Sequence, residues 1–463
     1  MFESIIYDKI ISFVRPFIST QQFGFLGNRS CLSQLLVYFS QICHCADLHG
    51  NSDAVFVDFK EAFDSVPHQE LLFKLWKIGI TGPLWLWFRN NLSNRHHFVS
   101  FGGASSESLA VASGIPQGSV LGPLLFLVYI NELPEVISHF SIYLFADDSK
   151  LVKSIRSMVD STLLQKDINS LEQWCRTWNL SLNIKKCAAL CFSLSRLPLS
   201  NQYYINGTAV DNSTSCKDLG IVTNTSLNWS SHYNYICCKA YRSLNLIKRI
   251  ISSSAPVNIK KRLYISLVRS QLSYCSQLWR SQFVNDIMSL ESVQRRSTKY
   301  IIQDYSSNYK QRLIFLNLLP LMYWYELQDM LFWLGVLKTL LIILTYTITF
   351  HLLLVQQDLH LTTNWGKTPA VHLVIGTSIL IALSSYGTHF QNWTFLYLSL
   401  LVKIYLQHIF GGTLLLNSIL KFHAHSTLSA HAIIVTCPMF ITKFSFGWLF
   451  SLILMFVFFL PLF

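Results

Sequence analysis

Three aspartates lie at the ends of short apolar runs, and this arrangement restricts the fold more than any other feature of the chain. The run Asp53–Asp58 is bounded by acids and has the length and composition of a buried strand. Ile142–Ala146 and Ser149–Ser154 predict two more strands, with Asp147 and Asp148 at the turn between them. A carboxylate beside buried apolar surface is costly to desolvate unless something neutralises it. The pattern therefore indicates either bound cations or a simple turn.

Divalent cations would account for such a group of carboxylates. Mg²⁺ takes oxygen ligands, usually one or two carboxylates together with phosphate oxygens and water. Two such ions, about 3.5–4 Å apart, can activate an attacking hydroxyl and stabilise a leaving phosphate. The alternative is that Asp147 and Asp148 only form a β-turn, which aspartate favours. The segments around the acids decide between these two hypotheses.

The rest of the chain predicts helices and a few short strands, with boundaries taken from apolar periodicity and turn residues. We expect helices over 1–50 with a break at Gln21–Asn28, after Pro67, and over Leu121–Leu133, Ser161–Trp178 and His232–Lys299. Leu72–Leu92 is amphipathic. We also expect a hairpin over Phe98–Val111, a strand at Cys187–Ser193 and a small hairpin region from Gly220.

The segments that carry the three aspartates resemble the polymerase motifs of reverse transcriptases. Asp58-Phe-Lys-Glu-Ala-Phe-Asp64 resembles motif A, Ser113–Phe126 with its Pro-Gln-Gly turn resembles motif B, and Phe145-Ala-Asp-Asp148 resembles motif C. Flanking segments resemble the finger segment before motif A, motifs D and E, and two thumb segments: Gln22–Ser30, Leu182–Cys187, Leu219–Gly220, Tyr274–Trp279 and Leu290–Arg296. Over residues 1–332 the combination resembles the reverse transcriptase of non-LTR (LINE-like) retrotransposons.

The resemblance implies an α+β fold with the right-hand architecture of polymerases. The palm, a small antiparallel sheet with helices, would carry motifs A to E over residues 53–225, including finger insertions. Residues 1–52 would form partial fingers, and residues 226–332 a helical thumb and connection. The family's fingers begin with a segment around Arg-Pro-Ile-Ser, which has no equivalent before Gln21, and we find no preceding endonuclease domain. Whether this shortened chain is active is therefore left open.

The resemblance also assigns roles to the acidic residues. Asp58 and Asp147 would hold two Mg²⁺ ions, for which Mn²⁺ is an alternative, and Asp148 would support the second ion and the primer end. The backbone carbonyl of Phe59 would add a ligand. Asp64 is expected to be structural instead, capping the turn into the next helix.

Four further residues match substrate-binding or proton-transfer positions of the family. Phe63 matches the steric-gate position, where a ring under the incoming sugar leaves no room for a 2′-OH; the alternative is an ordinary core aromatic. Gln117 and Gly118 lie in a turn that would contact the incoming nucleotide or the primer, and glycine allows the backbone to approach closely. Lys186 matches the motif D lysine, a candidate proton donor to the leaving pyrophosphate, with Lys185 beside it as the alternative.

The implied activity is that of an RNA-directed DNA polymerase, a nucleotidyltransferase that extends a primer 3′-OH on an RNA template. Its partners would be the RNA template, a DNA primer or target, and deoxynucleoside triphosphates, in the nucleus or the cytoplasm. Two alternatives are an inactive retroelement remnant and a membrane protein with a cytosolic reverse-transcriptase-like domain.

The net charge of the chain agrees with a nucleic-acid partner but does not require one. The formal net charge is +12, which indicates a polyanionic partner or simply a basic solvated surface. We expect the basic stretch Lys239–Lys261, followed by Arg269, Arg295, Arg296 and Lys299, to grip duplex phosphates; a solvated helix face is the alternative. The 11 cysteines lack the paired spacing of a zinc site, so reduced thiols are expected.

The composition changes near Trp333. Beyond it the chain has five lysines, one acidic residue (Asp358), and neither arginine nor glutamate. Taken literally, residues 333–463 form a hydrophobic helical tail, through which alone the chain would reach a membrane, with candidate spans at 334–355, 370–386, 394–410 and 444–463. We favour a shifted reading frame as the explanation. After such a shift, the third (wobble) base of each original codon becomes the middle base of a new codon. Where that base is a pyrimidine, the new codon encodes one of the residue types that dominate this tail.

Overall fold

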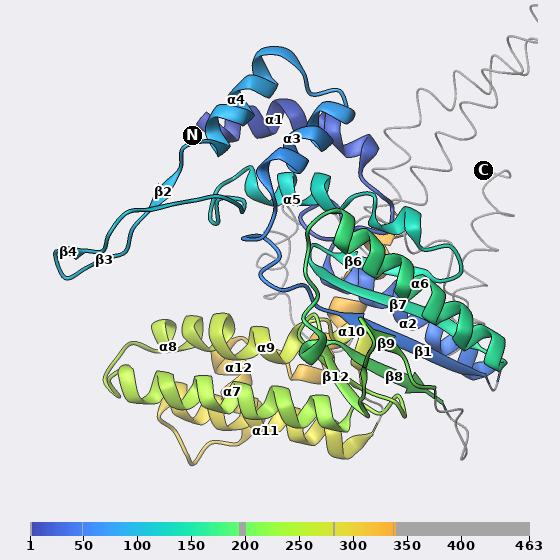
Figure 1. Ribbon diagram of the computed structural model, residues 1–463. Coiled ribbons are helices and arrows are strands. Elements are labelled where there is room, and N and C mark those ends of the chain that lie inside the picture. Colours follow the sequence, from blue (N-terminus) through green and yellow to red (C-terminus); the bar gives the residue numbers. More distant parts are fainter. Residues whose placement is uncertain (1, 49, 194–200, 281–282, 337, 339–463) are drawn as a thin grey trace, which may run out of the picture. The chain divides into compact units, whose positions relative to one another are not determined.

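The computed structural model describes residues 2–48, 50–193, 201–280, 283–336 and 338. These residues divide into two compact units, one ending at Cys238 and the other beginning at Lys239 (Figure 1). The first unit combines helices with small, mainly antiparallel sheets, and the described part of the second is helical. The fold class is therefore α+β, as the sequence predicted.

The hydrophobic tail from residue 339 onwards, and with it almost all of the four candidate spans, lies outside the described residues. Within the part of the chain that the structure describes, no helix is both long and apolar enough to cross a membrane. The hydrophobic helical tail, and the choice between a membrane region and a frameshifted product, stay predictions.

A five-stranded sheet forms the centre of the first unit. Its strands follow the order β11-β8-β1-β7-β6, with bounds Asp211–Asn212, Ala188–Phe192, Asn51–Val57, Asp148–Ile155 and Ser141–Phe145. All neighbours are antiparallel except β11 and β8, which pair in parallel over two residues. The strands expected from the three apolar runs are confirmed, with shifts of one or two residues at their ends.

Side chains of the central strand alternate between the two faces of the sheet, and each face is covered by a helix. Val55 and Val57 belong to the main core together with apolar residues of α6 (Met158–Thr177). On the opposite face, α2 (Cys31–Asp47) packs against the sheet, where the ring of Tyr38 lies 6.3 Å from that of Phe56. Burial on both faces makes β1 an almost continuous apolar run, which is why the sequence identified it.

Both covering helices begin at a serine that satisfies the free amides of the first turn. Ser30 forms a capping box with Ser33, and Ser157 forms one with Asp160. α2 follows α1 (Phe2–Val14) after the break at Gln21–Asn28 that the sequence predicted.

The helix expected after Pro67 is confirmed, and the amphipathic stretch Leu72–Leu92 is divided between two helices. α3 (His68–Lys77) ends before Gly79, which has a φ of +98°. α4 (Gly82–Leu92) begins with a proline in its first turn. The amphipathic pattern continues across the break, but glycine and proline at 79–83 separate the helices.

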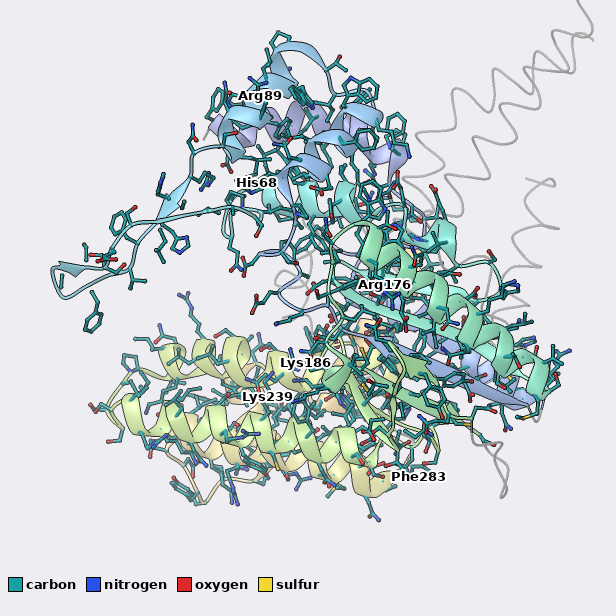
Figure 2. The ribbon with its side chains drawn as sticks, in the orientation of Figure 1. His68, Arg89, Arg176, Lys186, Lys239 and Phe283 are labelled. Carbon is teal, nitrogen blue, oxygen red and sulfur yellow. The ribbon has the colours of Figure 1, made fainter. Side chains whose placement is uncertain are left out.

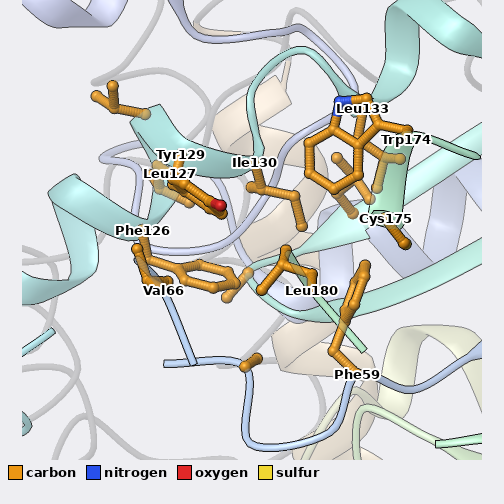
Figure 3. Packing of buried hydrophobic residues seen from close by; sticks show 14 of the residues in the cluster. Phe59, Val66, Phe126, Leu127, Tyr129, Ile130, Leu133, Trp174, Cys175 and Leu180 are labelled. Carbon is orange, nitrogen blue, oxygen red and sulfur yellow. The ribbon is translucent and has the colours of Figure 1, made fainter. Parts of the chain in front are cut away.

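α5 (Gly122–Ile130) is buried along its whole length except for Pro123. Figure 3 shows Phe126, Tyr129 and Ile130 of this helix packed in one core with Phe59. The last part of the motif B resemblance, Gly122–Phe126, therefore lies on a helix that the core holds from all sides. A 3₁₀ turn, η2 (Leu133–Val136), follows it.

The predicted hairpin over Phe98–Val111 is present as a narrow ribbon that extends away from the helices (Figure 1). Gly102 and Gly103, both at positive φ, make its turn, and Phe101 beside them is 87% exposed. Its strands are β2 (His96–His97), β3 (Ser100–Phe101), β4 (Ala104–Ser105) and β5 (Leu109–Ala110). Two smaller hairpins follow β8: β9 (Tyr204–Ile205) with β10 (Thr208–Ala209), and β12 (Ser215–Asp218) with β13 (Ile221–Asn224).

The described part of the second unit is built from helices, as predicted for this part of the chain. They are α7 (Ser230–Ile250), which begins in the first unit, α8 (Val257–Leu263), the π-helix η4 (Tyr264–Arg269), α9 (Ser270–Ser273), α10 (Ser276–Trp279), α11 (Val284–Ile302), α12 (Tyr309–Leu316) and a helix over 321–336.

The thumb-like segment Leu290–Arg296 places two polar residues inside this unit. Glu291 accepts hydrogen bonds from the Tyr309 hydroxyl and, at 2.9 Å, from the amide of Leu321. Gln294 donates to the carbonyl of Leu319 at 3.0 Å. Both side chains are buried and hydrogen-bonded, so they hold the turn before the last helix in place.

Two of the basic residues expected to grip duplex phosphates are buried instead. Lys260 donates to the carbonyl of Ser253 at 2.5 Å. Arg269 stacks on the ring of Trp324 at 4.4 Å and donates to a backbone carbonyl. Helical periodicity turns these two inward, so for them that prediction was wrong.

Lys74 on α3 is a buried cation inside the first unit. Its side chain is 2% exposed, and Nζ lies 3.7 Å from the Trp178 ring centroid and 3.3 Å from a carboxylate oxygen of Glu132. It also donates to the carbonyl of Tyr129 at 2.5 Å. Burial lowers the pKa of Lys74 from its usual value to about 8, although Glu132 opposes the shift.

We predict that Lys74 makes the free energy of unfolding rise with pH between about pH 8 and 10.5. In that window the unfolded chain binds a proton that the folded Lys74 has released, so stability rises with pH. Lys74→Met should remove this slope in denaturant unfolding of the full chain. Lys77→Met is the control, because Glu132 raises the pKa of exposed Lys77 and its contribution has the opposite sign. An unchanged slope in Lys74→Met would contradict the assignment.

Candidate active site

The pairing of β1 with β7 brings Asp58 to Asp148. The antiparallel register ends at Val57 opposite Ser149. Continued by one residue, it places Asp58 across from Asp148 on the same face of the sheet. Both line a small cleft with a volume of about 120 Å³ at this end of the sheet. Two carboxylates far apart in the sequence therefore meet at one position.

Asp147 lies in the turn that joins β6 to β7. Phe145 pairs with Asp148, so the turn consists of Ala146 and Asp147 alone. Ala146 has a φ of +55°, a left-handed conformation that is uncommon for a residue with a Cβ. The structure thus brings the three predicted acidic residues to one end of the sheet.

The three carboxylates disfavour one another's charge. Burial raises the pKa of Asp147, and Asp58 adds to the rise while Lys186 opposes it. Burial by neighbouring groups also raises the pKa of Asp148 to about 6, although its side chain keeps contact with solvent, and Asp147 and Asp218 add to that rise. Asp147 and Asp148 therefore hold protons more readily than isolated aspartates do, and a bound cation would relieve the repulsion.

The donor set fits a magnesium ion. Oδ2 of Asp58 is shielded from solvent and has no hydrogen-bond partner, which is costly for a carboxylate oxygen. Among the described residues, no three His, Cys, Asp or Glu side chains are already gathered as metal ligands. Mg²⁺ needs only one or two carboxylates, because phosphate oxygens and water complete its coordination.

Backbone hydrogen bonds attach the motif D segment to the strand end. The amide of Asn183 donates to the carbonyl of Asp58 at 2.8 Å, and the amide of Lys60 donates to the carbonyl of Ser181 at 2.7 Å. The 3₁₀ turn η3 (Ile184–Lys186) follows at once. It places Nζ of Lys186 3.5 Å from Oδ2 of Asp58, with the side chain largely exposed (Figure 2). Of the two neighbouring lysines, Lys186 is thus the one paired with a predicted catalytic carboxylate.

Motifs A and B are joined through Asp64, whose predicted role as a helix cap was wrong. Its carboxylate accepts two hydrogen bonds from Nε2 of Gln117, at 2.8 and 2.9 Å. Helix α3 begins later, after Pro67, without a side-chain cap. A Cβ at Gly114 would lie 2.8 Å from the carbonyl oxygen of Asp64, so glycine is required where the two segments touch.

The residues predicted to bind the nucleotide differ in their exposure to solvent. Gln117 and Gly118 are exposed, and Gly118 has a φ of +78° with open space around it. Phe63 is half-buried and stacks on Phe126 with 4.3 Å between ring centroids. Phe59 is buried in the core (Figure 3), so its side chain is not available to a ligand.

A buried ion pair beside Asp148 was not predicted from the sequence. Lys150 and Asp218 are 2% and 6% exposed and form an ion pair, and Nζ of Lys150 lies 4.4 Å from the ring centroid of Tyr38. The pair ties β7 to the β12–β13 hairpin, whose Leu219 lines the same cleft. A lysine at an inward-facing strand position was the one signal that could have indicated it.

Comparison with known proteins identifies the domain. Residues 1–229 match the family model described as reverse transcriptase (RNA-dependent DNA polymerase). A probable RNA-directed DNA polymerase from transposon X-element of Drosophila melanogaster is 27% identical over 310 residues, covering 65% of this chain and 34% of that protein. The RNA-directed DNA polymerase from mobile element jockey of the same species is 29% identical over 271 residues, or 56% of this chain and 29% of that protein. The chain carries a reverse transcriptase domain of the non-LTR retrotransposon type, which confirms the resemblance.

The curated relatives are longer than this chain. The chain spans about a third of the length of these curated relatives. Among solved structures, apo telomerase from Candida tropicalis is similar at a TM-score of 0.38 and 11% sequence identity, covering 68% of this chain and 53% of that chain.

We predict that Lys150→Met lowers the free energy of unfolding by about 3–5 kcal/mol, because it leaves Asp218 charged and buried without its partner. The double variant Lys150→Met/Asp218→Leu should recover most of this loss. Lys217→Met, at an exposed neighbouring position, serves as the control. Denaturant titration measures all three, and equal losses in the single and double variants would refute the role given to the pair.

Proposed function

We propose that this chain is an RNA-directed DNA polymerase that adds deoxynucleotides to a primer 3′-OH on an RNA template. The observation that carries the proposal is the meeting of Asp58, Asp147 and Asp148 at one end of the sheet, inside a reverse transcriptase domain. In this proposal residues 53–225 form the palm, 1–52 the partial fingers and 226–332 the thumb. The RNA template, DNA primer and action in the nucleus or cytoplasm belong to the same proposal.

Asp58 and Asp147 would hold two Mg²⁺ or Mn²⁺ ions, with Asp148 supporting the second. When bound, the ions would lower the cost of the attacking hydroxyl's deprotonation and stabilise charge on the leaving phosphate. Two observations support this assignment: Oδ2 of Asp58 is shielded from solvent without a hydrogen-bond partner, and burial raises the pKa of Asp147 although the exposed Lys186 opposes the rise.

The chain's other residues would bind and orient the substrate. The turn of Gln117 and Gly118 would approach the incoming nucleotide. Its backbone is accessible at Gly118, where no atom lies within 4 Å of the position that a Cβ would take. The ring of Phe63, held by stacking on Phe126, would occupy the space of a 2′-OH. Lys186 would donate a proton to the leaving pyrophosphate, since its exposed Nζ already lies beside Asp58.

We predict that Asp147→Asn lowers nucleotide addition by the full chain at least about a hundredfold, because it removes a charged metal ligand from a turn that accepts asparagine equally well. Primer extension on a homopolymer template in Mg²⁺ measures the effect. The same change at exposed Asp211, on the sheet's edge strand, is the control and should leave the rate unchanged. If the activity of Asp147→Asn stays within about tenfold of the parent activity, Asp147 is not a metal ligand.

We predict that Phe63→Ala raises incorporation of ribonucleotides relative to deoxynucleotides, because it empties the space that the ring is proposed to deny to a 2′-OH. Single-nucleotide extension with matched ribo- and deoxyribonucleoside triphosphates measures the ratio. Phe101→Ala, at the exposed tip of the hairpin ribbon, removes an aromatic ring elsewhere and should not change it. An unaltered ratio in Phe63→Ala would return Phe63 to the role of a core residue.

A further inference from the structure

The segment before α2 runs along the end of β6, next to the catalytic turn. The amide of Phe23 donates to the carbonyl of Leu144 at 2.8 Å, and the amide of Leu144 donates to the carbonyl of Gln21 at 3.0 Å. These two bonds extend the sheet by a short parallel bridge at its open edge. The bridge ends where the turn of Ala146 and Asp147 begins.

The side chain of Gln22 reaches from this bridge into the turn. It is 2% exposed, and its Oε1 accepts hydrogen bonds from the amide of Ala146 at 2.9 Å and from the amide of Gly24 at 2.8 Å. Its Nε2 donates to the carbonyl of Ala146 at 3.5 Å. One buried side chain therefore binds both backbone polar groups of the residue that precedes Asp147.

Gly24 allows this approach. A Cβ at position 24 would lie 2.4 Å from the amide nitrogen of Ala146 and 3.0 Å from the carbonyl carbon of Phe145. Contacts this short with backbone atoms cannot be relieved by a side-chain rotation. The segment and the turn can touch only because residue 24 has no side chain.

We propose that Gln22 is a positioning residue for the catalytic turn, and this inference rests on the proposed function. Ala146 has a left-handed φ that its own Cβ disfavours, so the turn needs external contacts to keep that conformation. By binding the Ala146 backbone, Gln22 sets the directions in which Asp147 and Asp148 leave the turn. Gly24 supports it by letting the segment lie against the turn.

Glutamine is suited to this position by its chemistry. It offers an acceptor with two lone pairs and a donor on one uncharged side chain. Glutamate would accept the same two amides but would bring a fourth negative charge beside three carboxylates, in a buried position. Methionine has a similar length and shape but would leave the Ala146 amide without its bond.

The experiment compares Gln22→Met and Gly24→Ala with two matched controls in the full chain. Gln21→Met makes the same change at the exposed neighbour. Gly27→Ala adds a methyl group where nothing lies within 4 Å. Three quantities are measured: hydrogen exchange of the Ala146 amide, kcat and KM for nucleotide addition on a homopolymer template with Mg²⁺, and the melting temperature.

We expect Gln22→Met and Gly24→Ala to speed exchange of the Ala146 amide and to lower kcat by roughly tenfold to a hundredfold, the effect of a displacement of about 1 Å at a reacting centre. KM for the nucleotide should stay near the parent value, because the nucleotide-binding turn at Gln117 is not touched. Both controls should match the parent in all three quantities.

Two outcomes would overturn the inference. One is an unchanged exchange rate at Ala146 in both test variants. The other is faster exchange with an unchanged kcat, which would make the contact purely structural. A parent chain that adds no nucleotides would instead refute the proposed function, and the exchange contrast at Ala146 would then decide the Gln22 contact independently.

Discussion

Antiparallel pairing between β1 and β7 is the interaction on which the candidate site depends. It places Asp58 beside Asp148 although the two are far apart in the sequence, and the hairpin to β6 adds Asp147. Bringing three carboxylates together is unfavourable by itself, as the raised pKa values of Asp147 and Asp148 indicate. The sheet can bear this cost because both of its faces are covered, by α2 on one side and α6 on the other, so that burial of apolar surface holds the strands in register.

Buried polar side chains fix the elements around this sheet. Gln22 binds the backbone of the turn of Ala146 and Asp147, the Lys150–Asp218 pair links β7 to the next hairpin, and Lys74 joins α3 to the end of α5. A buried polar group is costly unless all its hydrogen bonds are made, so each of these contacts allows few alternative arrangements. In a domain proposed to place a primer end, a nucleotide and two ions within a few ångströms, such restriction of the backbone is what the chemistry needs.

Much of the local structure could be predicted because its signals are local. The apolar runs that became β1, β6 and β7 and the glycine turn of the ribbon depend on neighbours within a few residues. The division of the amphipathic stretch Leu72–Leu92 into two helices was not predicted, because periodicity was given more weight than the glycines and proline that interrupt it. Lys260 and Arg269 were misplaced because charge was taken to mean exposure, whereas each finds a carbonyl or an aromatic ring inside the second unit.

The sequence by itself determined the class of the domain, the order of its motifs and the identity of the three acidic residues, because those depend on residue types and spacing along the chain. Only the tertiary structure decided that Asp64 binds Gln117 instead of capping a helix, that Lys186 is the lysine beside Asp58, and that Gln22 and Gly24 contact the turn of Ala146 and Asp147. Each of these contacts joins residues from different elements. The partner of a buried polar group is set by which backbone atoms come within hydrogen-bond distance after the core has packed, and no local pattern contains that information.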